Sequence, residues 1–598
     1  MSRPFLGIER SVTDRLWRDR LDDAGRATAL AFVQEYGLDD MLARVLVGRG
    51  VVASDLPAYL EPRLRDLMPD PSSLVGMDAA AERLADAIIA QQKIAIFGDY
   101  DVDGACSSAL LAGYLDAVGV ARIIHIPDRL IEGYGPNSEA IRSLHAAGAQ
   151  LLVTVDCGTT SHEPIEEATR LGMDTLVLDH HQAPVDLPRA LAIVNPNRQD
   201  DLSGLGHLCA AGVVFMTLIA VSRVLRRRGY WAGRAAEPDL MASLDLVALG
   251  TVADVVPLKG LNRAFVRQGL QVTRARSRPG LRALADIARL DGPMTPFHLG
   301  FLIGPRINAG GRIGDAALGA RLLLTHDDGE AVAIATRLDG LNKDRQAIEQ
   351  VMVAEAEAEA LAMLGIDEAN GNVIVTASTA WHPGVVGLVA SRLKERFRRP
   401  AFAIALDGRG TGTGSARSVA GVDLGRAVRA AVDAGLAIKG GGHAMAAGVT
   451  IEENKIDALR AFLETRLGTA SAEAREENGL DIDGSISAGG VRAALISEIE
   501  KAGPFGSSQP EPLFVLPSHI VVDAALVGTS HVRARFKSPD GTVIGGIAFR
   551  AADGPIGEAL LKGRGSALHI AGHLAIDRYG GGERPQIRIV DVARPVRA

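Results

Sequence analysis

The chain has 598 residues, of which 47% are apolar and 23% charged, and its formal net charge is −8. This length exceeds what one hydrophobic core supports, and the composition excludes collagen-like, coiled-coil and disordered chains, so several globular domains are expected. The charged start MSRPFLGIERSVTDRLWRD and the lack of an 18-residue uncharged apolar run exclude a signal peptide and a membrane span, which predicts a cytoplasmic protein without membrane association.

Strand, loop and helix patterns alternate in the first half of the chain. Residues 93–98 (KIAIFG), 151–155 (LLVTV) and 175–179 (TLVLD) are short apolar runs, each followed by acidic or imidazole residues, and helical patterns follow the first two. This alternation predicts a parallel α/β sheet, and ligands of such sheets bind beyond the carboxyl ends of the strands. One site could therefore collect the polar residues.

Further elements predict the domain order. Helical patterns cover 206–229, 238–250 and the long stretch 328–366, a second α/β segment begins near 372, and five strand-like segments with one helix near 555–562 end the chain, as in an OB-fold. The expected segments are a helical 1–75, a first α/β domain at 76–327, a connecting helix at 328–368, a second α/β domain at 369–468, a polar linker with one short helix at 469–512, and an OB-fold-like β-barrel at 513–598.

The segment Gly98–Gly104 (GDYDVDG) places three carboxylates, Asp99, Asp101 and Asp103, on alternate residues. They repel one another unless cations neutralise them, which predicts a divalent-metal site. An EF-hand loop starts in the same way but needs Glu at its twelfth position, where this chain has Leu110. A solvated turn remains the simple alternative.

Three further pieces follow at strand or helix ends. Asp156 follows LLVTV, where a helix N-cap is the simple alternative. Asp179, His180 and His181 end the next strand and offer imidazoles beside a counter-charge, unless the histidines are satisfied core residues. Asp254 interrupts the apolar run TVADVVPL, and a buried carboxylate needs a partner such as a metal.

In this order the segments GDYDVDG, DCG, DHH and TVADVVPL resemble the four motifs of the DHH phosphoesterase superfamily. The resemblance implies two Mn²⁺ or Mg²⁺ ions as cofactors, consistent with a mixed Asp and His ligand set. It assigns Asp101 and Asp156 to one ion and Asp103, Asp156, His180 and Asp254 to the other, with Asp156 bridging and Asp99 and His181 close by as a further ligand or phosphate contact. Phe97 stands where some members have a His ligand.

Within this superfamily the chain resembles the RecJ family of exonucleases, from about residue 40 to the end. The resemblance rests on IPDR and EGYG near 126–135, PRINAGGR at 305–312, WHPGVVG at 381–387, GSARS at 414–418 and GGGH at 440–443. The fold it implies is a parallel-sheet DHH domain joined by a long helix to a smaller DHH-associated domain, plus the barrel. The substrate-binding residues it implies are Arg129, Arg306, Arg312, Ser415 and Arg417 for a 5′-terminal phosphate, with His382 and His443 lining the cleft. Glycine-rich turns beside such residues let backbone amides approach a phosphate.

The implied activity is 5′ to 3′ hydrolysis of single-stranded DNA to mononucleotides in repair and recombination, by a monomer aided by a helicase and a single-strand-binding protein. An acidic chain needs a local basic surface for this role. Residues 515–598 carry 11 Lys and Arg against 7 Asp and Glu, a charge of +4. Strand alternation predicts Arg533, Arg535 and Lys537 on one face, unless that face is merely solvated, with Phe536, Phe549 and Tyr579 as candidates for base stacking.

Two other functions stay open. A DHH phosphatase or short-oligonucleotide ribonuclease predicts a much shorter chain without the barrel. An inactive RecJ-like DNA-binding scaffold predicts lost ligands, whereas all those named above are present. The chain has no GxxxxGK[ST] motif, so the sequence gives no support to an ATP-driven motor. The three cysteines, Cys106, Cys157 and Cys209, indicate neither a disulfide framework nor a zinc site.

Overall fold

A computed structural model describes residues 4–128, 132–133, 135–233, 236–365, 370–578 and 582–595. The chain divides into two compact units: Leu67–Glu476 forms one, and Met1–Asp66 together with Glu477–Ala598 forms the other. None of the helices in the described ranges combines the length and the apolar character needed to span a bilayer.

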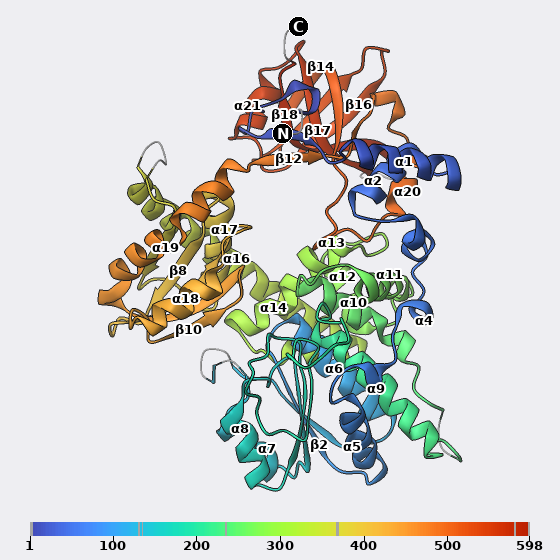
Figure 1. Cartoon of the computed structure of the whole chain (residues 1–598), viewed down its shortest axis with the longest axis vertical. Helices are drawn as coiled ribbons and strands as arrows, with labels where there is room; N and C mark the ends of the chain where they lie inside the picture. Colours follow the sequence, from blue (N-terminus) through green and yellow to red (C-terminus); the bar gives the residue numbers. More distant parts are fainter. Residues whose placement is uncertain are drawn as a thin grey trace. The chain divides into compact units, whose positions relative to one another are not determined.

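The larger unit begins with a sheet of five parallel strands in the order β3-β2-β4-β5-β6 (Figure 1). The strands are β2 (Ile94–Gly98), β3 (Arg122–His125), β4 (Leu151–Val155), β5 (Asp174–Leu178) and β6 (Ala192–Val194). All residues of β2 and β4 are buried, which explains their unbroken apolar runs, because strands covered on both faces do not alternate. The predicted parallel α/β fold is confirmed.

Helices cover both faces of this sheet. The connecting helices are α6 (Val102–Ala117), α7 (Ser138–Ala146) and α8 (His162–Arg170), while α5 (Met77–Ile89) precedes the sheet and α9 (Ala210–Arg227) follows it. In Figure 1, α7 and α8 pack together on one side of β2, and α5 and α9 pack together on the other. This is the layering of a doubly wound sheet.

The strand order reverses between β2 and β4. The chain leaves β2 for β3 on one side and then places β4 on the other side of β2. Ligands of open parallel sheets bind at the carboxyl ends of strands beside such a reversal. The acidic loop after β2 and Asp156 after β4 both begin at this point, so the topology selects the edge where a site is expected.

A group of helices follows the sheet. It consists of α10 (Leu244–Ala253), α11 (Gly260–Thr273), α12 (Pro279–Ile287), α13 (Pro296–His298), a π-helical turn (Leu299–Ile303), α14 (Gly304–Ile313), α15 (Leu318–Leu324) and the long α16 (Asp328–Leu364). The prediction of a glycine-rich turn at 305–312 is wrong, because these residues form most of α14. Their glycines permit close packing: a Cβ on Gly311 would lie 2.4 Å from the Tyr100 carbonyl oxygen.

The second sheet of the larger unit has the order β10-β11-β9-β8-β7. Its strands are β7 (Ile374–Ser378), β8 (Ala401–Leu406), β9 (Thr411–Arg417), β10 (Lys439–Gly442) and β11 (Ala446–Glu452), with helices α17 (Val386–Phe397), α18 (Leu424–Asp433) and α19 (Ile456–Glu476). Only the β7–β8 pair is parallel among the described strands of this sheet. The apolar faces of the strands and helices form two cores, one on each side of the sheet.

The smaller unit joins the two ends of the chain. Strand β1 (Leu16–Asp19) pairs in parallel with β12 (Gly479–Ile482), and β13 (Gly484–Ser485) pairs with β14. Its helices are α1 (Asp23–Tyr36), α2 (Asp40–Gly48), α3 (Leu56–Leu60), α20 (Ala493–Glu500) and α21 (Pro555–Leu561), with α4 (Leu64–Leu67) at its border. Short 3₁₀ helices occur in both units. Those of the smaller unit are Phe5–Gly7, Ala53–Asp55 and Ala488–Gly490, and those of the larger unit are Pro71–Ser73, Leu240–Ser243 and Glu453–Lys455.

This arrangement differs from the linker expected at 469–512 and from a purely helical 1–75. The first residues of the expected linker extend α19, and the rest contributes β12, β13 and α20. Strands β12 and β13 are short and contain few apolar residues, so their composition predicts a loop. Their hydrogen-bonding partners, β1 and β14, come from elsewhere in the chain and supply the order that local sequence lacks.

The predicted OB-fold-like barrel is confirmed. Strands β14 (Phe514–Val527), β15 (His531–Lys537), β16 (Val543–Ala548), β18 (Arg584–Ala593) and β17 (Ala567–Asp577) neighbour one another in this order, and β17 pairs with β14 to close the ring. Phe536 is wrong as a stacking candidate, because strand alternation points it into the barrel core, where it is fully buried. Phe549 is exposed, and Tyr579 lies outside the described residues.

Candidate metal centre

The acidic loop turns directly from β2 into α6. Asp101 is the N-cap of α6, and its side chain accepts a hydrogen bond from the Gly104 backbone N–H at 3.0 Å. A Cβ on Gly104 would lie 2.3 Å from the carbonyl oxygen of Asp99, so only glycine permits this tight turn. The spacing of the three aspartates therefore follows from a strand that ends where a helix begins.

This packing gives a first prediction, for Gly104→Ala. The added methyl group meets backbone rather than a movable side chain, so the loop must shift and the aspartates with it. We expect a folded protein that has lost its thermal stabilisation by Mn²⁺, measured by scanning calorimetry with and without the ion. Gly113→Ala in the same helix is the control, since its Cβ would meet only Leu324 at 3.9 Å; an equal loss there would contradict the prediction.

Asp103 is 1% exposed and points toward the start of α9. Its two carboxylate oxygens accept hydrogen bonds from the backbone N–H groups of Ala210, at 2.6 Å, and Ala211, at 3.0 Å. Burial nevertheless raises the pKa of Asp103, with Asp101 adding to the rise, and these backbone donors oppose it. The N-terminus of α9 thus orients the Asp103 carboxylate, but its backbone donors do not fully offset the cost of burying the negative charge.

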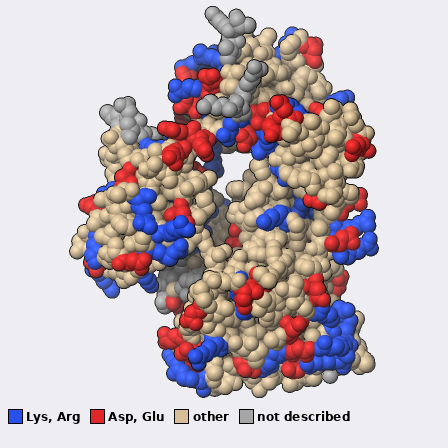
Figure 2. Space-filling view, in the orientation of Figure 1, with Lys and Arg blue, Asp and Glu red and all other residues tan. Residues whose placement is uncertain are grey.

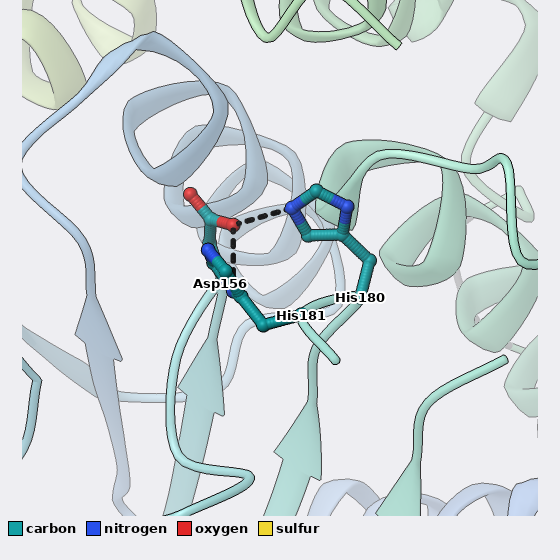
Figure 3. A group of neighbouring side chains, drawn as sticks. All are labelled: Asp156, His180 and His181. Carbon is teal, nitrogen blue, oxygen red and sulfur yellow. Dashed lines mark ion pairs between the residues drawn. The ribbon is translucent and has the colours of Figure 1, made fainter. Parts of the chain in front are cut away.

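Asp156 and the two histidines meet at the ends of β4 and β5 (Figure 3). The His180 Nε2 atom lies 3.2 Å from Asp156 Oδ1, and His181 Nδ1 lies 4.0 Å from the same oxygen. His180 Nε2 is also 3.6 Å from Asp254 Oδ2 and 3.9 Å from Asp103 Oδ2. One imidazole therefore faces carboxylates from three separate segments of the chain.

The potential ligand atoms fall into three groups, and within each group the atoms lie within 4.8 Å of one another. The groups are Asp99, Asp101 and Asp156; Asp103, His180 and Asp254; and Asp156, His180 and His181. Asp156 and His180 each belong to two groups, so the three groups form one connected cluster. All the metal and catalytic side chains predicted from the sequence thus lie in one place.

Electrostatics in this cluster are unfavourable without cations. Burial, followed by the neighbouring aspartates, raises the pKa of Asp156 and of Asp254 well above the usual range. The Oδ1 atom of Asp156 is buried and accepts no hydrogen bond among the described residues. Asp156 also has a φ of 61°, a left-handed conformation that costs energy for a non-glycine residue. Oxygen-rich ligands with one or two imidazoles fit hard divalent cations such as Mn²⁺ or Mg²⁺.

Asp179 supports the two histidines as the counter-charge expected from the sequence, whereas two further supporting residues, Asn195 and Asn197, were missed. Asp179 accepts hydrogen bonds from the His180 and His181 backbone N–H groups and pairs with His181 Nδ1 at 2.8 Å. Asn195 and Asn197 donate to the His181 and His180 carbonyl oxygens. The signal available in the sequence was a pair of asparagines directly after the short apolar run 192–194, at the carboxyl end of another strand of the same sheet.

Phe97 does not approach the cluster as a ligand. It is fully buried in the core beneath the sheet, and its ring centroid lies 5.0 Å from that of His125 on the neighbouring strand β3. The carboxylate of Asp99 lies instead in one group with those of Asp101 and Asp156.

The larger unit has two lobes: the first contains the parallel sheet and the helices up to α16, and the second contains the sheet β7–β11 with α17, α18 and α19. The second lobe brings together part of the predicted phosphate-binding set. Arg417 Nη1 donates to Ser415 Oγ at 2.9 Å, and both side chains lie against Gly387, whose added Cβ would be 3.3 Å from Arg417 Nη2 and 3.2 Å from Ser415 Oγ. His382 Nδ1 accepts from the Gly384 N–H at 3.1 Å. The pKa of His443 is lowered by burial and then by the charges of His181 and His180, which shows that His443 lies within electrostatic range of the metal-site histidines.

The predicted arginines of the first lobe have other contacts. Arg306 Nε pairs with Asp339 Oδ1 at 2.9 Å, and its Nη1 donates to the Leu302 carbonyl at 2.7 Å. Arg312 Nη1 donates to the Gly384 carbonyl at 3.2 Å, which joins the two lobes of this unit. Arg129 lies outside the described residues.

In the barrel, the side chains of β15 alternate between buried and exposed. Arg533, Arg535 and Lys537 are all exposed, as predicted, and Arg535 forms an ion pair with Asp523. On the face of the molecule drawn in Figure 2, basic and acidic side chains are interspersed.

Comparison with known domains defines the class of protein. Residues 93–251 match the model of the DHH family, N-terminal domain, 370–469 the DHHA1 domain, and 482–591 the RecJ OB domain. The parallel sheet, the reversal between β2 and β4 and the Asp–His cluster thus belong to a DHH-type phosphoesterase.

Individual relatives narrow this class. The single-stranded-DNA-specific exonuclease RecJ of Escherichia coli is 37% identical over 94% of this chain and 96% of its own length, and the enzyme of that name in Bacillus subtilis is 32% identical over 96% and 70%. The crystal structure of RecJ in complex with Mn²⁺ from Thermus thermophilus matches at a TM-score of 0.76 and 29% identity, covering 96% of this chain and 79% of that one. The chain belongs to the RecJ family.

Proposed function

We propose that the protein is a two-metal exonuclease that hydrolyses single-stranded DNA from its 5′ end and releases mononucleotides, in DNA repair and recombination. The observation that carries the proposal is the convergence of four acidic or imidazole segments, one of which contains Asp156, in a single cluster at the reversal point of the sheet. The E. coli and B. subtilis relatives are named as single-stranded-DNA-specific exonucleases, which supports the substrate.

We assign roles to the chain's own residues from their positions in the cluster. Asp101 and Asp156, with Asp99, would hold one ion. Asp103, His180 and Asp254 would hold the other, together with Asp156, whose Oδ1 lies 3.2 Å from His180 Nε2. Two divalent cations, Mn²⁺ or Mg²⁺, would activate a water as nucleophile and neutralise charge at the scissile phosphate. Asp179 holds His181 and raises its pKa to about 9 in the metal-free protein, and a protonated His181 would add a positive charge beside the phosphate.

The 5′ polarity is supported by the second lobe. Ser415, Arg417 and the backbone at Gly387 form a compact donor surface of the kind that binds a terminal phosphate. His443 lies on the same lobe and within range of the metal-site histidines. A phosphate held there would set the distance from the strand end to the bond that is cut, which makes the cleavage exonucleolytic. Arg129 and Arg312 would complete this surface, and Arg306 would act through α14.

Single-strand binding is supported by two surfaces. One is the basic face of β15. The other is a pair of stacked, exposed rings, Phe297 and Phe301, whose centroids are 5.0 Å apart. They flank Gly300, which packs against Val252, two residues before Asp254. Exposed aromatic faces bind unpaired bases by stacking, whereas bases in a duplex are already stacked on each other.

A second prediction concerns the basic face of the barrel. The double substitution Arg533→Ala and Lys537→Ala is expected to weaken binding of single-stranded DNA and to lower the salt dependence of log K by about 1.4, at roughly 0.7 per lost phosphate contact. Fluorescence anisotropy over a series of salt concentrations measures both quantities. Lys562→Ala on α21 of the same barrel, which removes an exposed lysine paired with Glu558, is the control and should leave the slope unchanged.

Digestion of end-labelled strands tests the proposed function. Single strands labelled at the 5′ or the 3′ end are incubated with the wild type or Asp103→Ala, in Mn²⁺ or EDTA. The expected result is early release of the 5′ label as mononucleotide by the wild type in Mn²⁺ only. Asp116→Ala, at the exposed end of the same helix α6, should retain activity. Early release of the 3′ label, or activity surviving in Asp103→Ala, refutes the proposal.

The same assay separates the alternative functions. A phosphatase or short-oligonucleotide ribonuclease would leave long labelled DNA intact, and an inactive scaffold would bind it without any release. A helicase and a single-strand-binding protein are the partners that this activity calls for, since the substrate must first be unwound and kept single. We propose that the enzyme works as a monomer with such partners.

A further inference from the structure

Helix α14 packs directly beneath the acidic loop. A Cβ on Gly311 would lie 2.4 Å from the carbonyl oxygen of Tyr100, so the helix backbone and the loop backbone approach as closely as glycine allows. Tyr100 lies between Asp99 and Asp101 in the sequence. The position of α14 therefore limits where the first two aspartates can lie.

A side chain of α14 also binds the loop. The side-chain carbonyl of Asn308 accepts a hydrogen bond from the Val102 backbone N–H at 3.1 Å. Val102 is the first residue of α6 and lies between Asp101 and Asp103. Backbone N–H groups in the first turn of a helix have no partner within the helix, so Asn308 satisfies one of them. Movement of Val102 would displace the carboxylates on both sides of it.

Other contacts fix α14 itself. Near its start, Arg306 pairs with Asp339 of α16 and donates to the Leu302 carbonyl. At its far end, Arg312 donates to the Gly384 carbonyl of the second lobe. A helix held at both ends is a rigid support for a hydrogen bond to a neighbouring loop.

We propose that Asn308 is a positioning residue for the metal centre, which sets the directions of Asp101 and Asp103 by holding the Val102 N–H between them. The inference rests on the proposed function, because it assumes that these aspartates bind the ions. Loss of a residue that orients metal ligands typically lowers metal affinity by about 10- to 100-fold. We expect a weakening of this size for Asn308→Ala.

Titration of the DNA-free, EDTA-treated and dialysed full chain with Mn²⁺ by isothermal calorimetry tests this role. Asn308→Ala should shift the titration to about 10- to 100-fold higher Mn²⁺, whereas Asn308→Asp, which keeps an acceptor oxygen, should remain close to the wild type. Asn342→Ala is the control: Asn342 is also an asparagine whose side-chain oxygen accepts a hydrogen bond, from Arg345, but it lies in α16. It should bind Mn²⁺ as the wild type does.

Nuclease kinetics give a second readout. Asn308→Ala should need more Mn²⁺ for half-maximal activity and recover most of the wild-type kcat at saturating Mn²⁺. Wild-type Mn²⁺ affinity in Asn308→Ala, an equal loss in Asn342→Ala, or an equal loss in Asn308→Asp would each overturn the inference. Absence of Mn²⁺ binding by the wild type would instead refute the proposed metal centre, so the two failures are distinguishable.

Discussion

Asp156→Asn is expected to abolish nuclease activity, with a loss of at least about 10³-fold, while the protein stays folded. Asp156 belongs to two of the three ligand groups, and its Oδ1 lies 3.2 Å from Nε2 of His180, which belongs to the third, so its loss is expected to weaken both proposed ion sites together. Metal ions stabilise the transition state by several kcal/mol, and each 1.4 kcal/mol corresponds to a factor of ten in rate. The rate of mononucleotide release under saturating Mn²⁺ measures the effect.

The same substitution is expected to stabilise the metal-free protein. Burial and the surrounding aspartates raise the pKa of Asp156, so its ionised form destabilises the native state at neutral pH. Asn removes that charge. The apparent Tm in EDTA should therefore rise, and the further increase caused by Mn²⁺ in the wild type should be lost. A Tm in EDTA that falls below the wild-type value would contradict this account.

The pH dependence of stability follows from the same groups. Because the pKa values of Asp103, Asp156 and Asp254 are raised in the folded, metal-free protein, the contribution of these three groups to stability is fully present at low pH and is lost as pH rises through their folded pKa values. Burial opposes protonation of His181, but Asp179 and other carboxylates outweigh burial and raise its pKa to about 9. Protonated His181 therefore stabilises the folded state, and this stabilisation is lost as pH rises from about 6.5 to above 9.

Urea unfolding of the wild type in EDTA should thus show a falling midpoint between pH 7 and 9. His180, whose pKa is lowered by burial, contributes with the opposite sign, but it titrates below this range. Saturating Mn²⁺ should flatten the dependence, because the ions compensate the carboxylates. A midpoint that rises with pH in EDTA would contradict the assignment.

Asp483→Ala is expected to destabilise the smaller unit by about 3–5 kcal/mol. Asp483 pairs with Arg49 at 2.7 Å, and their side chains are 0% and 1% exposed. Its carboxylate also pairs with Arg20 Nε at 3.0 Å and accepts the Leu513 backbone N–H at 2.9 Å. Removing Asp483 leaves the Arg49 charge buried without a carboxylate partner among the described residues, although it still donates to the Pro510 carbonyl. An unpaired buried charge costs far more than the pair itself contributes.

Hydrogen exchange read by mass spectrometry measures this effect locally, since it reports the free energy of opening for each segment. Peptides from β12, β13 and α2 should lose protection, while those from the first sheet of the larger unit should not change. Asp481→Ala is the matched control: Asp481 pairs with Arg18 and Arg20 but is 40% exposed, so at most about 1 kcal/mol is expected. Equal losses of protection in the two variants would show that burial of the pair is not the cause.

The sequence by itself determined the strands β2, β4 and β5 of the larger unit and the candidate metal ligands at their carboxyl ends. Apolar runs that end in Asp or His, such as LLVTV before Asp156, predict both the strand and the side chain at its carboxyl end, because parallel α/β sheets place such residues at a common edge. The exposed basic face of β15 followed in the same way from period-two alternation. These are local properties, and local sequence is enough to predict them.

Contacts between distant segments were decided only by the tertiary structure. The sequence of residues 305–312 suggests a turn, because glycines usually mark turns. In the structure these residues form α14, and their glycines let the helix approach Tyr100 closely. Only this approach brings Asn308 to the Val102 N–H. The segment 469–512 reads as a linker, and it becomes ordered through β1, β14 and the buried Arg49–Asp483 pair. Such contacts arise from burial and pairing across the fold, and the composition of either partner alone carries no signal of them.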